Sequence, residues 1–273
     1  MTFSTLPPDM IDTLRQDPNI KVDIFDSWMW VPGKINVKKA PTDNLKFREA
    51  LTHIMDYDSV AKQIYAGFAS VSEGPTPMAL PGAIAYNMPK FDLDLAKKLL
   101  DESGVPKDQW KITWVAYSGV DVLKNIALLF QANAAKVGVQ VEIVQGDWGV
   151  VWDKQKHLET AANVFPYRTW PDYATIQPSS DFETQKDVSF NLGFYSNPQV
   201  DAWIDEGTKE EAVDKKKSAE AWQKAYTQII ADAAAMWIAD AKRVIAHRAD
   251  LQGIESDPAY ETVFFYGLHR GAS

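Results

Sequence analysis

Apolar positions along the chain follow two periods, one typical of helices and one typical of strands. Phe47, Ala50, Leu51, Ile54 and Met55 recur at the spacing i, i+3, i+4, i+7 and i+8, which predicts an amphipathic helix. The same period predicts helices at 8–15, 59–66, 93–103, 122–137, 147–155, from 198 onward and at 219–235. Alternating or continuous apolar runs predict strands or extended segments at 20–25, 28–37, 111–117, 139–144, around 165 and at 236–246.

Capping residues sharpen several of these boundaries. Asp92 precedes the helix at 93–103 and is the expected N-cap, while Asn197-Pro198 is a typical helix start. Gly67 and Gly104 stand where the preceding helices should end. We interpret the charged run 209–217 as a solvated turn and helix start, and the proline-rich segment 73–89 as a loop.

The order strand, helix, strand over 111–144 has the lengths of a βαβ crossover. Gly138 ends the helix just before the second strand. Such a crossover joins parallel strands, so we expect 111–117 and 139–144 to pair in parallel. Because helices and strands alternate through most of the chain, the sequence predicts an α/β fold.

Composition excludes several functions. The 273 residues carry a net charge of −9, which argues against a nucleic-acid-binding protein, since that requires a basic face. The chain has no cysteine, which rules out disulfides, thiolate metal sites and cysteine catalysis. No apolar run reaches the length of a membrane span. The first 16 residues lack a basic n-region, so we expect no signal peptide in this chain.

No catalytic or cofactor motif is evident. The sequence has no G-x-S-x-G, no Walker A and no G-x-G-x-x-G motif. Its four histidines are not spaced as metal ligands, and we interpret His53, within a helix, and His247, after a strand, as structural. Asp172 and Asp181 could form an acid pair of the glycosidase type, but 37 acidic residues make such pairs common by chance. We expect no catalytic residue, metal or cofactor.

The segment Trp170-Pro171-Asp172-Tyr173 is the best candidate for a binding site. It follows a short apolar strand and presents one carboxylate between two aromatic rings, with Arg168 close by. Ligands of open α/β sheets bind at such strand ends, where a carboxylate shielded from water attracts an ammonium strongly. Alternatively, Asp172 is the N-cap of a helix that starts at Tyr173. The residues alone leave both interpretations open.

Several further segments share their order and spacing with one family of binding proteins. They are the Asn-to-Ala segment 36–50, Met55-Asp56-Tyr57-Asp58, Gly67, Gly74-Pro75, Pro81-Gly82, the Ala-Lys-Lys-Leu-Leu helix at 96–100, and Tyr195-Ser196-Asn197-Pro198 with Asp201. Together with the aromatic segment, they resemble the family 5 extracellular solute-binding proteins of ABC importers, the oligopeptide, dipeptide and nickel-binding group. Each match is weak alone, and their arrangement carries the resemblance.

The resemblance implies one lobe of a type II periplasmic-binding-protein-like fold, with a mixed sheet flanked by helices. Residues 41–240 would form the second, C-terminal lobe of a two-lobed protein. Residues 1–40 and 241–273 would be crossover strands and remnants of the first lobe, and the chain would be the C-terminal portion of a periplasmic or extracellular protein. Exposed Trp28, Trp30, Phe264 and Phe265 would then favour self-association.

The resemblance also implies a function without catalysis. Peptide-binding members pair an Asp with the ammonium of the peptide, and that position falls on Asp172, with Trp170 and Tyr173 lining the pocket and Arg168 as a further candidate. Ala174-Thr175 departs from the Asp-Pro of many members, which affects the choice of solute. We therefore expect a peptide or peptide-like solute and a membrane permease as partners. An oligosaccharide, or a hydrolase on a similar α/β lobe, is the alternative.

Overall fold

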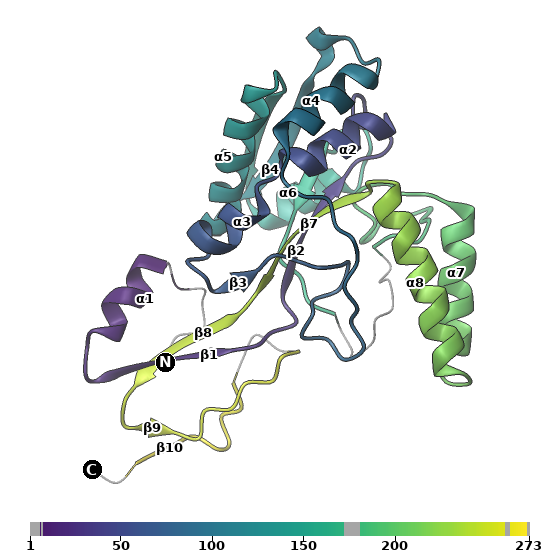
Figure 1. Cartoon of the computed structure of the whole chain (residues 1–273). Helices are drawn as coiled ribbons and strands as arrows, with labels where there is room; N and C mark the ends of the chain where they lie inside the picture. The colour runs from purple at the N-terminus through teal and green to yellow at the C-terminus, as the bar shows by residue number, and fades with distance from the viewer. Residues whose placement is uncertain (1–5, 7, 172–180, 260–262, 272–273) are drawn as a thin grey trace.

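A twisted mixed sheet with helices against it forms the main body of the protein in the computed structural model (Figure 1). The structure describes residue 6 and residues 8–171, 181–259 and 263–271. The sheet has the strand order β3 (Ala69–Ser70), β7 (Ala235–Ala241), β2 (Trp30–Ile35), β6 (Val164–Pro166), β4 (Lys111–Tyr117), β5 (Gln140–Gly146). This mixed α/β architecture confirms the predicted fold class.

The βαβ prediction is confirmed. β4 pairs in parallel with β5 over its full length and also lies parallel to β6, whereas β2 is antiparallel to both β6 and β7. Helix α5 (Asp121–Lys136) connects β4 to β5 and packs on the sheet, where the rings of Phe130 and Trp114 lie 4.5 Å apart. The carboxyl ends of β4, β5 and β6 therefore meet at one edge of the sheet.

The remaining helices begin and end largely where their capping residues predict. α2 (Leu45–Ile54) and α4 (Leu93–Glu102) pack together beside α5 (Figure 1), and the Asp92 carboxylate accepts a hydrogen bond from the amide of Leu95 at 2.9 Å. The remaining elements of the main body are α3 (Tyr57–Ser59), the π-helix η1 (Val60–Ile64), the 3-10 helix η2 (Lys107–Gln109) and α6 (Trp148–Gln155). The single predicted helix at 59–66 is thus a short α-turn followed by a π-helix.

Two helices form a separate hairpin at one side of the sheet (Figure 1). α7 (Pro198–Glu210) starts after the N-cap Asn197, as predicted. α8 (Lys215–Ala231) starts earlier than expected, because Asp214 caps it by accepting from the amides of Lys216 and Lys217 at 3.1 Å. The charged run 209–217 therefore contains the end of one helix, a turn and the start of the next.

The predicted strand at 236–246 is two strands. β7 lies in the six-stranded sheet, and after Lys242 the chain turns into β8 (Arg243–Arg248), which pairs antiparallel with β1 (Ile20–Phe25) in a two-stranded ladder. One apolar period covers both strands, so the change of sheet leaves no signal in the sequence. His247 lies inside β8 rather than after a strand.

The ladder, together with α1 (Pro8–Arg15), β9 (Leu251–Gln252) and β10 (His269–Arg270), lies away from the helical layers (Figure 1). β2 precedes residue 40 but pairs within the large sheet.

The expectation that Trp30 is exposed is wrong. Its ring is 6% exposed and stacks on Trp237 with centroids 5.5 Å apart, while Trp28 is partly buried and its indole N–H donates to the carbonyl of Ala79 at 3.2 Å. Phe264 and Phe265 are exposed by 51% and 57%. Self-association through them stays a prediction, which sedimentation velocity over a concentration series would test.

Candidate functional site

The carboxyl ends of the parallel strands carry a cluster of aromatic side chains. Tyr117 is the last residue of β4, Trp148 and Trp152 lie one turn apart on α6 just after β5, and Tyr167 directly follows β6. Phe190 reaches this cluster from a later loop. We call Tyr117, Trp148, Trp152, Tyr167 and Phe190 the aromatic face. Its place at the carboxyl ends is where open α/β sheets bind ligands.

The rings of the aromatic face contact one another continuously. Trp148 lies 4.7 Å from Tyr117 and 4.8 Å from Trp152, measured between centroids. Trp152 in turn lies 5.9 Å from Tyr167 and 5.5 Å from Phe190. Trp148 and Phe190 are nevertheless 42% and 45% exposed. Large rings that pack on a rigid base but keep open faces offer an apolar platform for a ligand.

A buried ionic cluster lies beneath this edge. The ammonium of Lys34 on β2 is 2.9 Å from the carboxylate of Asp181, which also accepts a hydrogen bond of 2.8 Å from the hydroxyl of Tyr167. Lys34 further lies 3.3 Å from the centroid of the Phe182 ring. Burial lowers the pKa of Lys34 to about 8, although Asp181 raises it in opposition.

Asp181 is therefore committed to a structural ion pair, and it is only 5% exposed. This placement argues against the hypothesis that Asp172 and Asp181 form an acid pair of the glycosidase type. Sequence reasoning missed the role of Lys34, because nothing in the pattern of β2 distinguishes this lysine from a surface one.

The structure places two of the four predicted site residues. The backbone amide of Arg168 donates to the Tyr117 hydroxyl at 3.3 Å, and its side-chain Nε and Nη2 lie 3.2 and 3.1 Å from the sulfur of Met29. Trp170 is 39% exposed and follows Thr169, which bridges to Trp30. Both therefore lie at the same edge as the aromatic face. Asp172 and Tyr173 lie outside the described residues.

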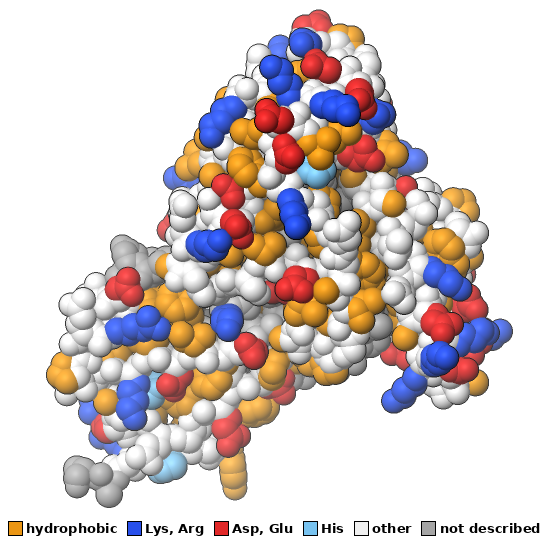
Figure 2. All heavy atoms as spheres, in the orientation of Figure 1, with side chains coloured by type: hydrophobic (Ala, Val, Ile, Leu, Met, Phe, Trp, Pro, Cys, Tyr) orange, Lys and Arg blue, Asp and Glu red, His pale blue; other side chains and the backbone are white. Residues whose placement is uncertain are grey.

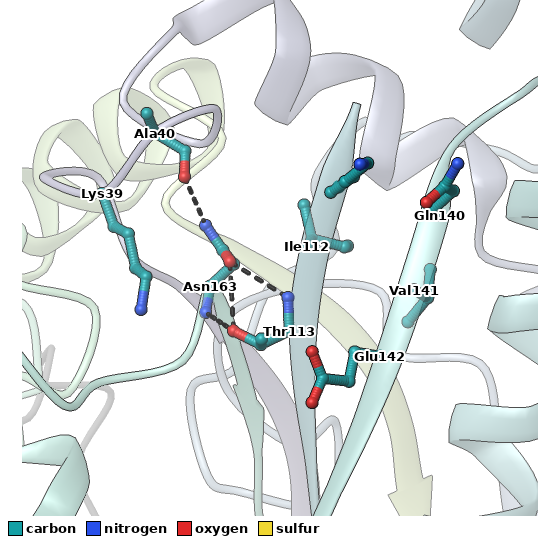
Figure 3. Close-up of a pocket in the computed structure, with 9 residues that line it drawn as sticks. Lys39, Ala40, Ile112, Thr113, Gln140, Val141, Glu142 and Asn163 are labelled. Atoms are coloured by element: carbon teal, nitrogen blue, oxygen red, sulfur yellow. Dashed lines mark hydrogen bonds between the residues drawn. The ribbon is translucent and has the colours of Figure 1, made fainter. Parts of the chain in front are cut away.

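A cavity of about 400 Å³ opens at the other end of the same strands, lined by Lys39, Ala40, Lys111, Ile112, Thr113, Gln140, Val141, Glu142 and Asn163 (Figure 3). The side chain of Asn163 lies in this lining. Its amide oxygen accepts hydrogen bonds from the backbone amide and the hydroxyl of Thr113 at 3.0 and 3.1 Å, and its amide nitrogen donates one to the carbonyl of Ala40 at 3.1 Å. Lys39 donates to the carbonyl of Ala161. These polar groups hold the loop before α2 against the sheet, so we interpret the cavity as structural.

Two histidines have structural partners, as expected. Nδ1 of His53 donates to the carbonyl of Lys90 at 2.7 Å, and Nε2 of His247 lies 2.9 Å from the carboxylate of Asp23 across the β1–β8 ladder. Within the described ranges, no group of three or more His, Asp or Glu side chains could hold a metal ion.

No helix in the described part of the chain is long and apolar enough to cross a membrane. On the face shown in Figure 2, acidic and basic side chains are interspersed.

Comparison with known sequences identifies a family. Residues 1–187 match the model of the bacterial extracellular solute-binding proteins, family 5 (middle). The chain is 28% identical over 241 residues to the glutathione-binding protein GsiB of Pectobacterium atrosepticum, an alignment that covers 85% of this chain and 46% of that protein. The chain thus spans about half the length of the curated relatives it matches.

Solved structures show the same fold. The dipeptide-binding protein of Pseudoalteromonas sp. SM9913, in complex with Met-Leu, superposes with a TM-score of 0.81 at 23% identity over 97% of this chain and 52% of that one. NikA of Staphylococcus aureus, in complex with Ni(L-His)2, superposes with a TM-score of 0.80 at 23% identity over 96% of this chain and 56% of that one. At 23% identity, these two likenesses show the fold.

Proposed function

Because the chain belongs to the family 5 bacterial extracellular solute-binding proteins, we propose that it forms one lobe of the solute site of an ABC importer and that the solute is a peptide. The observation that carries this proposal is the aromatic face at the carboxyl ends of β4, β5 and β6. Its exposed rings supply apolar contact area, and Arg168 supplies a positive charge beside them. No enzyme chemistry is needed for this role.

Asp172 is the proposed contact for the ammonium of the peptide. In the sequence it stands two positions after Trp170, which lies exposed at the same edge as the aromatic face. A carboxylate near apolar rings attracts an ammonium more strongly than one in open water does. Tyr173 is proposed to line the same pocket.

We further propose how the chain is divided between two lobes. Residues 41–240, together with β2 in their sheet, would form the solute-binding lobe, and the rest of 1–40 and 241–273 would carry the crossover between two lobes. The β1–β8 ladder, which leaves the large sheet after Lys242, has the form of such a connection. Closure of two lobes around the solute would precede delivery to a membrane permease.

The test is a binding screen with the 273-residue chain. Glutathione and dipeptides are the first ligands to try, because relatives are named for them, and oligosaccharides serve as the competing class. A ligand at about 100 times its dissociation constant adds about 2.7 kcal/mol of stability, which a thermal-shift assay detects. Stabilisation by oligosaccharides but not by peptides would overturn the proposed solute class.

A matched pair of variants tests the role of Asp172. Asp172→Asn should weaken binding of a peptide about tenfold to a hundredfold, since one charge-assisted hydrogen bond contributes roughly 1.5–3 kcal/mol. Asp187→Asn, at an exposed acid beyond the aromatic segment, should bind as the wild type does. Unchanged affinity of Asp172→Asn in titration calorimetry, with an unchanged melting temperature, would remove Asp172 from the site.

A further inference from the structure

Gln155 is the last residue of α6, the helix that carries two rings of the aromatic face. α6 has eight residues, and a helix of this length is not stable by itself, so contacts with the rest of the protein must hold it in place. Two of its side chains are buried, Val151 and Gln155, which are 4% and 1% exposed. Hydrogen bonds are directional and apolar contacts are not, so Gln155 is the side chain that fixes the rotation of α6 about its axis.

The side-chain amide of Gln155 makes three hydrogen bonds to backbone groups of two other segments. Its oxygen accepts from the amide of Ala162 at 2.9 Å, and its nitrogen donates to the carbonyls of Ala162 and Leu192 at 3.4 and 2.9 Å. The oxygen faces a donor and the nitrogen faces two acceptors, so one orientation of the amide satisfies all three bonds. Gln155 therefore ties α6 both to the segment before β6 and to the loop that contains Phe190.

Gln155 shares one side of α6 with the two indole rings. Trp148, Trp152 and Gln155 stand at the spacing i, i+4 and i+7, which places them on one face of a helix. The bonds of Gln155 therefore set the direction in which both indoles point. A turn of the helix about its axis would break these bonds and would move Trp148 and Trp152 together.

The two segments that Gln155 binds carry the other rings around Trp152. The segment after Ala162 runs through β6 to Tyr167, whose ring lies 5.9 Å from that of Trp152. In the loop, the Leu192 amide donates to the Phe190 carbonyl at 2.7 Å, and the Phe190 ring lies 5.5 Å from that of Trp152. One buried amide thus connects the three parts of the chain whose rings meet at Trp152.

Resting on the proposed function, we propose that Gln155 is a positioning residue of the aromatic face. It is too deeply buried to touch the solute, and it acts by holding α6, the segment that leads to Tyr167 and the loop of Phe190 in one arrangement. Trp148 and Phe190 are 42% and 45% exposed, so the surroundings of these two rings restrain them on one side only. Rings that are already in place bind more tightly, because the solute does not have to order them.

The binding test removes the amide and keeps the length of the side chain. Gln155→Met should weaken binding of Met-Leu about fivefold to tenfold in titration calorimetry, a loss comparable to one hydrogen bond, because the solute must then order the rings itself. Ser218→Ala is the matched control: Ser218 is 3% exposed, and its hydroxyl donates to the carbonyl of Gly207 at 2.7 Å in the α7–α8 hairpin. Both variants should melt below the wild type, but Ser218→Ala should keep full affinity. Wild-type affinity in Gln155→Met would overturn the proposal.

Circular dichroism tests the positioning without any solute, and so separates this proposal from the proposed function. The indoles of Trp148 and Trp152 have centroids 4.8 Å apart at an angle of 46°, so their electronic transitions couple and give an exciton signal. Trp30 and Trp237 also lie close together, so the signal of the first pair is the part that Trp148→Phe removes. Gln155→Met should lose most of this part, and the control variant should keep it.

The two readouts can fail independently. If no peptide binds and Gln155→Met still loses the exciton signal, the proposed function fails and the positioning role of Gln155 stands. An exciton signal that Gln155→Met leaves intact would overturn the positioning role, whatever the solute.

Gln155→Glu covers the case in which Gln155→Met does not fold. A buried carboxyl takes up a proton readily, and the protonated form can accept from Ala162 and donate to Leu192 as the amide does. In mildly acidic buffer this variant should therefore show the exciton signal of the wild type. In mildly alkaline buffer the carboxylate has no proton to donate to Leu192, and the signal should fall. A signal of Gln155→Glu that is the same in both buffers would contradict the proposed role.

Discussion

Lys34 and Asp181 form an ion pair of 2.9 Å in the interior of the protein, although 147 positions separate them in the sequence. Their side chains are 1% and 7% exposed. The pair joins β2, at the centre of the sheet, to the segment that follows the candidate site. Because burial removes both charges from water, each depends on the other for stabilisation.

We expect Lys34→Met to destabilise the fold by about 3–5 kcal/mol, since it leaves the Asp181 carboxylate buried without its cation. Lys34→Met combined with Asp181→Asn should recover a large part of that loss, because no charge then remains buried. Urea denaturation of the two single variants and the double variant measures both effects. A double variant that is as unstable as the sum of the single variants would contradict the ionic explanation.

Asp240 predicts a specific dependence of stability on pH. Burial raises the pKa of this carboxyl to about 6, although hydrogen bonds from the Ser72 hydroxyl and the Met78 amide oppose the increase. Between about pH 4 and pH 6 the folded state therefore binds more protons at Asp240 than the unfolded state does. The contribution of Asp240 to the free energy of unfolding is fully present below pH 4. It is lost as the pH rises to 6, which lowers the free energy of unfolding by about 3 kcal/mol.

Asp240→Asn should remove this component, so its free energy of unfolding should fall less than that of the wild type between pH 4 and pH 6. Asp187→Asn, at an exposed acid, should keep the wild-type slope. Chemical denaturation at a series of pH values checks the prediction. Parallel curves for the wild type and Asp240→Asn would show that Asp240 does not titrate in this range.

Local elements of the fold could be predicted from the sequence, and long-range partners could not. The helix after Asp92 and the parallel pair of β4 and β5 follow from periodicity, capping and connection length, all of which act over short separations. The burial of Trp30 depends on Trp237, which is more than 200 residues away, so its expected exposure was wrong.

The candidate site could likewise be predicted only in its local part. The segment around Arg168 and Trp170 was evident from its composition and from the end of a short strand. The aromatic rings of α6 were not evident, because only the parallel pairing of β4 with β5 and β6 brings the end of each strand to the same edge.

The α7–α8 hairpin depends on the absence of a side chain at Gly207. A β-carbon at this position would lie 2.5 Å from the ring of Trp222, which is 1% exposed. We expect Gly207→Ala to cost about 1–3 kcal/mol, because the buried indole must move. Gly149→Ala in α6 is the matched control, since its β-carbon would meet no atom within 4 Å, and it should be neutral or stabilising by up to about 1 kcal/mol. Equal melting temperatures of both variants would contradict this packing argument.

The aromatic face predicts where affinity can be lost without loss of stability. Trp148 is 42% exposed, so Trp148→Ala should weaken peptide binding about fivefold to thirtyfold through lost apolar contact, with only a small change in melting temperature. Leu128→Ala is the control, because Leu128 is similarly exposed at 45% but lies on α5, and it should bind as the wild type does. Titration calorimetry with Met-Leu measures both variants. If Trp148→Ala kept full affinity, the solute would have to bind away from the carboxyl ends of the strands, and the cavity around Asn163 would become the next place to probe.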